Sequence, residues 1–113
     1  MGGVVTLGSG KSWATTGYVF EQFLRHVIAR NKSDQQMVEH LESSIYNQGL
    51  SFDLVEDQEL ERRLLDAMRV AASDVVRNKT GRSVEGCDWE LSDKDFEIYL
   101  KSVERLLGML AKT

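Results

Sequence analysis

The sequence predicts an all-α fold: a single four-helix bundle-like domain at residues 13–113, preceded by a flexible leader at residues 1–12. Apolar residues recur at spacings of three, four and seven along most of the chain after residue 13, which is the period of amphipathic helices. Each predicted helix has one apolar face, so the helices must pack together to bury these faces. The length of 113 residues is typical of one domain.

The leader is rich in Gly and Ser, a composition typical of flexible chain. We expect no strand at residues 4–7, because a lone strand has no evident partner. Residues 8–12 (Gly-Ser-Gly-Lys-Ser) resemble the end of a phosphate-binding P-loop, but Val5 stands where that motif needs its first Gly. An all-helical remainder also lacks the parallel sheet of a P-loop protein, so we expect no nucleotide and no other cofactor.

The first helix is expected to start at Trp13 and to end near Arg30. Ser33 and Gln36 form a capping-box pattern, which predicts the start of the second helix. Gly49 predicts its end, because glycine readily adopts the left-handed conformation of a helix stop.

The third helix is expected to begin between residues 53 and 57 and to end at Gly81. Residues 82–91 are predicted to form a loop, the longest connection in the bundle. Ser92 predicts the start of the fourth helix, since acidic residues follow it in the first turn, where the helix dipole favours negative charge.

Candidate catalytic and metal-binding groups are sparse. His26 and His40 lack the spacing of a shared metal site, and both are expected at helix surfaces or boundaries. Cys87 is flanked by Asp88 and Glu90, whose charges raise the pKa of a thiol and oppose its use as a nucleophile. We therefore expect no metal site and no enzymatic activity.

The net charge of −4 is unevenly distributed. Residues 53–61 and residues 85–97 each carry a net charge of −5, so the remainder of the chain carries +6. Helix-dipole complementarity and a solvated surface explain such segments in many proteins, and a recognition surface is the alternative. Nucleic-acid binding is not expected of a net acidic chain without a concentrated positive face, and no apolar run is long enough for a membrane span.

These charges favour a small acidic, non-enzymatic protein-binding module of the inhibitor, immunity-factor or regulatory-subunit type that engages a basic partner protein. Trp89 would supply an aromatic anchor, and burial as a lid over the end of the bundle is its alternative fate. The predicted partner-binding residues are Asp88, Trp89, Glu90, Asp93 and Glu97, with a second patch of Glu56, Asp57 and Glu59. The sequence leaves open whether the two acidic segments lie at one end of the bundle.

A self-associating, dimeric helical module is the alternative function. Tyr99, Leu106 and Leu107 widen the apolar face of the fourth helix, while Tyr46 and Leu65 lie off the main apolar faces of theirs. If one four-helix core cannot cover these side chains, a second copy would. A cytoplasmic location is expected, because the chain has a single cysteine and no secretory signal pattern.

Overall fold

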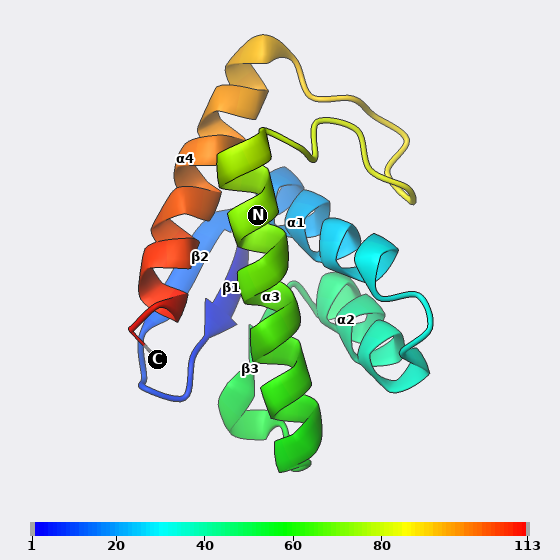
Figure 1. Cartoon of the computed structure of the whole chain (residues 1–113), viewed down its shortest axis with the longest axis vertical. Coiled ribbons are helices and arrows are strands. Elements are labelled where there is room, and N and C mark those ends of the chain that lie inside the picture. Colours follow the sequence, from blue (N-terminus) through cyan, green and yellow to red (C-terminus); the bar gives the residue numbers. More distant parts are fainter. Residues whose placement is uncertain (1, 113) are drawn as a thin grey trace.

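The computed structural model describes residues 2–112 and shows an α+β fold, so the all-α prediction is wrong (Figure 1). A three-stranded mixed sheet packs with four helices. The elements in chain order are β1 (Gly2–Thr6), β2 (Ser12–Thr16), α1 (Gly17–Arg30), α2 (Gln35–Asn47), β3 (Gly49–Ser51), the short 3-10 helix η1 (Phe52–Leu54), α3 (Gln58–Asn78) and α4 (Asp93–Leu110).

Residues 2–12 of the predicted flexible leader form β1, a turn and the first residue of β2, which together with the rest of β2 make a β-hairpin. β1 and β2 pair antiparallel, with Val5 opposite Trp13, and a turn at residues 7–11 joins them. The N–H of Leu7 donates to the carbonyl of Lys11 at 2.8 Å, and Gly10 takes a φ of +87°, which a residue with a side chain rarely adopts. The strand that we excluded for want of a partner therefore has one immediately after the turn.

A second partner for β1 comes from much later in the chain. β3 pairs parallel to β1, with Leu50 beside Val5, which gives the strand order β2-β1-β3. Side chains alternate between the two faces of a strand, so Val5, Trp13 and Leu50 share the inner face, where each is at most 2% exposed. The hairpin is thus fixed by burial of its inner face in the core.

Trp13 belongs to this sheet and not to a helix. Its indole Nε1 donates to the carbonyl of Ser102 in α4 at 2.9 Å, and its ring packs edge-on against Phe23 of α1 at 5.8 Å. The first helix consequently begins at Gly17, four residues later than predicted.

The helix ends lie close to the predicted positions, but the residues that cap or end α2 are not the predicted ones. Asp34, and not Ser33, caps α2 by accepting from the N–H of Met37. The left-handed residue that ends α2 is Gln48, while Gly49 begins β3. The prediction that Ser92 caps the last helix is confirmed, because its hydroxyl accepts from the N–H of Asp95.

α3 and α4 run antiparallel, and the segment between them leaves the bundle and returns (Figure 1). The start of α3 and the start of α4 lie at opposite ends of the long axis of the molecule, so the two acidic segments are far apart. None of the helices within residues 2–112 combines the length and the apolar character that crossing a bilayer requires.

Candidate functional site

Residues 79–92, here called the strap, connect α3 to α4 and extend along α1 (Figure 1). Lys79 begins the strap in the left-handed conformation, with a φ of 53°. Within the strap, the N–H of Leu91 donates to the carbonyl of Arg82 at 3.0 Å, and a tight turn follows Val84. Val84 and Leu91 are both buried, so the strap is packed onto the core rather than loose.

One buried amide attaches the strap to α1. Gln22 is fully buried, and its Nε2 donates to the carbonyls of Gly81 at 2.7 Å and Arg82 at 3.1 Å. At the far end of α1, Lys32 forms an ion pair with Glu85. The strap therefore follows α1 over most of its length.

Trp89 and Tyr18 flank a hollow of about 300 Å³ where the strap returns past the start of α1. Glu90, Leu91 and Asp95 also line it, and no Lys or Arg does so in the part of the chain that the structure describes. Trp89 is 38% exposed, so it is not buried as a lid. The pKa of Tyr18 is raised by partial burial and by the nearby carboxylate of Asp95, as expected for a site that collects negative charge.

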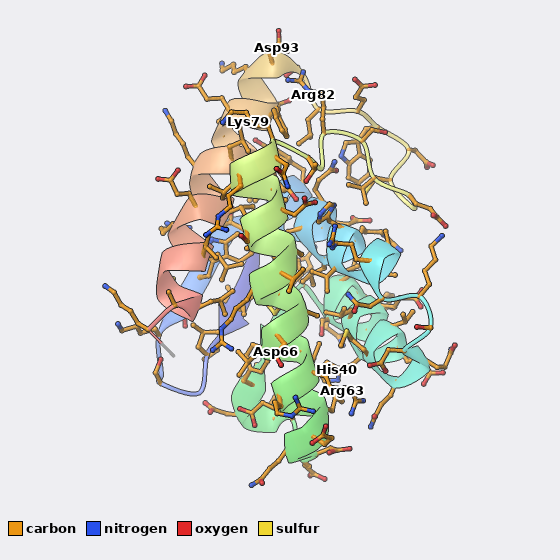
Figure 2. All side chains as sticks on the ribbon, viewed as in Figure 1. His40, Arg63, Asp66, Lys79, Arg82 and Asp93 are labelled. Carbon is orange, nitrogen blue, oxygen red and sulfur yellow. The ribbon has the colours of Figure 1, made fainter. Side chains whose placement is uncertain are left out.

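The predicted acidic residues have different fates. Asp93 pairs with Arg82 at 2.6 Å at the start of α4 (Figure 2), and Glu97 pairs with Lys101 at 3.2 Å. Within residues 2–112, the carboxylates of Asp88, Glu90 and Asp95 have no ion pair.

The second predicted patch is separate from the strap. Asp57 caps α3 by accepting from the N–H groups of Glu59 and Leu60, while Glu59 pairs with Arg62. Glu56 is exposed. The structure brings Asp88, Trp89 and Glu90 together on the strap, and it places Glu56, Asp57 and Glu59 at the other end of the molecule.

Sequence reasoning missed three of the residues that line the hollow: Tyr18, Leu91 and Asp95. Asp95 was assigned only to the first turn of the last helix, and Tyr18 was given no role. The apolar periodicity of α1 carries no signal for Tyr18, because its contact with the hollow depends on a strap some seventy residues later.

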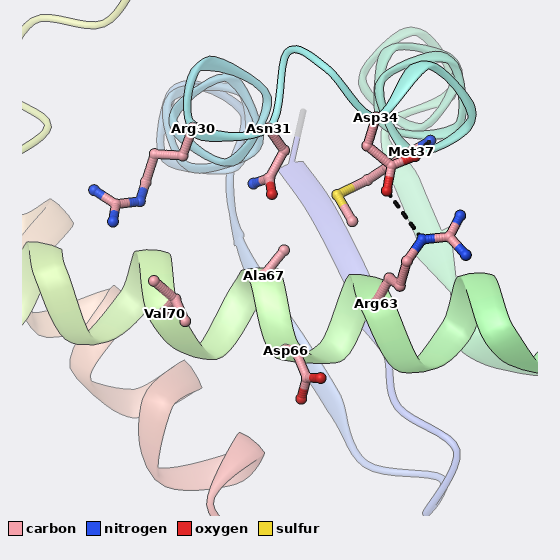
Figure 3. Close-up of a pocket in the computed structure, with 8 residues that line it drawn as sticks. All are labelled: Arg30, Asn31, Asp34, Met37, Arg63, Asp66, Ala67 and Val70. Carbon is pink, nitrogen blue, oxygen red and sulfur yellow. Dashed lines mark hydrogen bonds and ion pairs between the residues drawn. The ribbon is translucent and has the colours of Figure 1, made fainter.

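A second hollow, of about 350 Å³, lies between the end of α1, the start of α2 and the middle of α3 (Figure 3). Its charges are already paired: Arg63 contacts Asp34 at 2.9 Å, Arg30 contacts Asp74 at 3.2 Å, and Asp66 lies within 3.5 Å of two arginines. A charged ligand would have to compete with these pairs, so we regard the Tyr18–Trp89 hollow as the candidate site.

The residues weighed for chemistry are placed as follows. Residues 8–11 lie in the turn of an antiparallel hairpin and Ser12 begins β2, whereas a P-loop leads from a strand into a helix. The absence of a sheet, one of the two grounds on which we excluded a P-loop, does not hold. Burial, and then the carboxylate of Glu21, raises the pKa of Cys87 to about 11. His26 is only 9% exposed, so its expected surface position is wrong. Residues 2–112 contain no group of three His, Cys, Asp or Glu side chains placed to hold one metal ion.

Comparisons with protein-family models, with curated proteins and with solved structures give no match to this chain.

Proposed function

We propose that the chain is a non-enzymatic protein-binding module that engages a basic partner protein through the strap and the first turn of α4. The observation that carries this proposal is the partly exposed Trp89, which lines the hollow with Glu90 and Asp95 and follows Asp88 in the chain. Within residues 2–112, none of these three carboxylates forms an ion pair. Aromatic side chains with one face available are frequent anchors of protein interfaces. Unpaired carboxylates around such an anchor attract a basic partner and repel an acidic one.

Two of the residues predicted for this surface contribute less. Asp93 and Glu97 already face Arg82 and Lys101, so a partner's cation would gain little from them. The patch of Glu56, Asp57 and Glu59 forms no part of the proposed surface, because it lies at the opposite end. We also propose a cytoplasmic location, since a single thiol suits a reducing compartment.

The test uses a double variant, Trp89→Ala with Glu90→Lys, against a matched control, Tyr46→Ala with Glu56→Lys. Tyr46 is 88% exposed and Glu56 is exposed, so the control makes the same chemical changes away from the strap. Each protein is immobilised, proteins are captured from native lysate and identified, and the affinity of each purified candidate is measured.

The proposal expects a partner with a high isoelectric point whose affinity falls at least tenfold in the strap variant and by less than threefold in the control. Its association rate should fall steeply with added salt, because the encounter is electrostatic. Equal binding by wild type and strap variant would remove the proposed site.

Self-association is a second candidate, although the helical face that we expected to mediate it is not exposed. Tyr99 and Leu106 lie fully buried in the core, and Leu65 and Leu107 pack partly buried against it. Of the five side chains predicted to need a second copy, Tyr46 alone is exposed, so they do not form the wide helical face that we expected. The outward face of the sheet instead bears only uncharged residues: Gly2, Val4, Thr6, Ser12, Ala14, Thr16, Gly49 and Ser51.

An uncharged sheet face suits a second copy of this chain, because two acidic molecules can meet there without bringing like charges together. Val4 on this face is 39% exposed, and it lines a hollow of about 270 Å³ with Leu54, which is 79% exposed. Sedimentation equilibrium of wild type and a Val4→Lys variant tests this: a dimer that the variant abolishes supports the candidate, and a monomer at millimolar concentration removes it.

A further inference from the structure

The Tyr18–Trp89 hollow combines two kinds of group that recognise one kind of cation. Tyr18 and Trp89 contribute aromatic side chains, whose faces attract cations. Glu90 and Asp95 contribute carboxylates, which accept hydrogen bonds from N–H donors and which form no ion pair with any described residue. Among residues 2–112, the lining thus has two negative charges and no positively charged side chain.

The protein contains a filled version of the same arrangement nearby. The guanidinium of Arg82 lies 4.6 Å from the centre of the Phe96 ring and donates to the carboxylate of Asp93 at 2.6 Å. There, an aromatic face and a carboxylate from the first turns of α4 hold an arginine from the strap. The hollow likewise has aromatic side chains and carboxylates in its lining, and none of the described residues places an arginine there.

We propose that the hollow binds the side chain of an arginine presented by the partner protein; this rests on the proposed function. A guanidinium is planar, so it stacks on an aromatic ring while its N–H groups point to carboxylates in the plane. The volume of about 300 Å³ is at the small end of ligand sites, which suits one long side chain rather than a larger ligand.

Other occupants fit this lining less well. A phosphate or carboxylate would be repelled by Glu90 and Asp95. A ligand that excludes water from the hollow removes the hydrogen bonds between water and the two carboxylates. A trimethylated ammonium has no N–H donor, so it cannot replace these hydrogen bonds. A lysine ammonium can donate but is compact and strongly hydrated, and it does not stack.

The experiment titrates the full chain with three capped tripeptides, Gly-Arg-Gly, Gly-Lys-Gly and Gly-citrulline-Gly, at low salt. Citrulline has the shape of arginine without its charge. The readout is the NMR signal of the Trp89 indole N–H, and the indole of the fully buried Trp13 is an internal control. We expect a saturable shift of Trp89 with the arginine peptide, binding at least tenfold weaker with citrulline, and several-fold weaker with lysine.

Two carboxyl variants locate the effect. Asp95→Asn should weaken binding of the arginine peptide at least threefold, and Glu56→Gln at the opposite end should leave it unchanged. The helix start survives in Asp95→Asn, because the contact with Ser92 uses the backbone N–H of Asp95. Unchanged thermal midpoints will show that each variant is folded.

Equal shifts with arginine and citrulline, or no shift of Trp89, would overturn the inference. In that case, a protein partner lost by the strap variant would still support the proposed function, so the two can fail separately. A Trp89 shift that Glu56→Gln removes as effectively as Asp95→Asn would also overturn the inference, since it would reflect overall charge.

Discussion

Gly3 lies on the inner face of β1, where the backbone passes directly over the ring of Phe20. A Cβ added at Gly3 would lie 2.0 Å from Cγ of Phe20 and 2.5 Å from its Cβ. Ordinary carbon–carbon contacts are about 3.5–4.0 Å, so the ring or the strand would have to move by at least ~1.5 Å. Phe20 is 2% exposed and belongs to the core, so the ring has no free space to enter.

We therefore expect Gly3→Ala to destabilise the protein by about 3 kcal/mol, the upper part of the range for overpacked cores. The thermal midpoint of a domain of this size should fall by roughly 10–20 °C. Gly8→Ala is the matched control in the same segment. A Cβ at Gly8 meets only the Oε1 of Glu61, at 3.8 Å, so stability should be unchanged or higher by up to about 1 kcal/mol.

Urea denaturation followed by far-UV circular dichroism measures both variants under the same conditions. The double variant Gly3→Ala with Phe20→Leu should lose less stability than the sum of the losses in the two single variants, because the smaller leucine side chain leaves room for the new methyl group. If Gly3→Ala were as neutral as Gly8→Ala, residues 1–12 would behave as the flexible leader of the sequence prediction, and the hairpin would be refuted.

Three further predictions concern two buried polar side chains and the partly buried Cys87. Gln22→Leu removes both hydrogen bonds to the strap and should cost about 1–3 kcal/mol in urea denaturation; no change would mean that the strap is not held there. Burial lowers the pKa of His26 by more than the carboxylate of Asp74, 3.5 Å away, raises it. As the pH falls below about 6.5, His26 is therefore protonated in the unfolded chain before it is protonated in the folded protein. The free energy of unfolding should therefore decrease from pH 7 toward pH 5, and His26 contributes at most about 1.4 kcal/mol per pH unit to this decrease. In His26→Gln, the free energy of unfolding should depend less on pH over this range. An equally steep pH dependence in the variant would contradict the prediction. Cys87, with its pKa raised to about 11, should react slowly with iodoacetamide at pH 8 and faster as the pH rises, and rapid labelling of the folded protein at pH 7 would contradict its placement.

The sequence predicted the helical part of the fold better than the sheet. The apolar stripes of α3 and α4 are long enough to reveal their period, and the cap at Ser92 was correctly identified. The sheet escaped detection because an alternating pattern is visible only when the outer face is polar. Here Val4 and Ala14 point outward, so β1 and β2 show no clear alternation. β3 has three residues, too few to show any period.

Trp13 shows why this ambiguity changed the fold class. Its spacing to Phe20 also suits a helix face, and no local signal distinguishes the two assignments. What decides is tertiary: the indole donates to Ser102, almost at the other end of the chain, and the residue opposite it in the sheet is Val5. Interactions between such distant residues are not encoded in a window of neighbouring positions.

The candidate site was predictable in its centre and not in its surroundings. A tryptophan among carboxylates in a long loop indicated an interface, and the structure leaves Trp89 partly exposed beside Glu90. The contribution of Tyr18 depends on the path of the strap, which Gln22 fixes through a hydrogen bond between distant residues. Composition cannot predict that path.

The two acidic segments have the same net charge, but their carboxylates differ in the contacts that they make within the protein. In the segment at residues 53–61, which includes the start of α3, Asp57 caps the helix and Glu59 pairs with Arg62, so these carboxylates stabilise local structure. In the strap, Asp88 and Glu90 have neither a cap nor a cation within residues 2–112. Unpaired carboxylates on a strap packed onto the core contribute little to folding but can attract a ligand. It is therefore the absence of an internal partner, and not the density of acidic residues, that separates the candidate binding surface from ordinary helix capping.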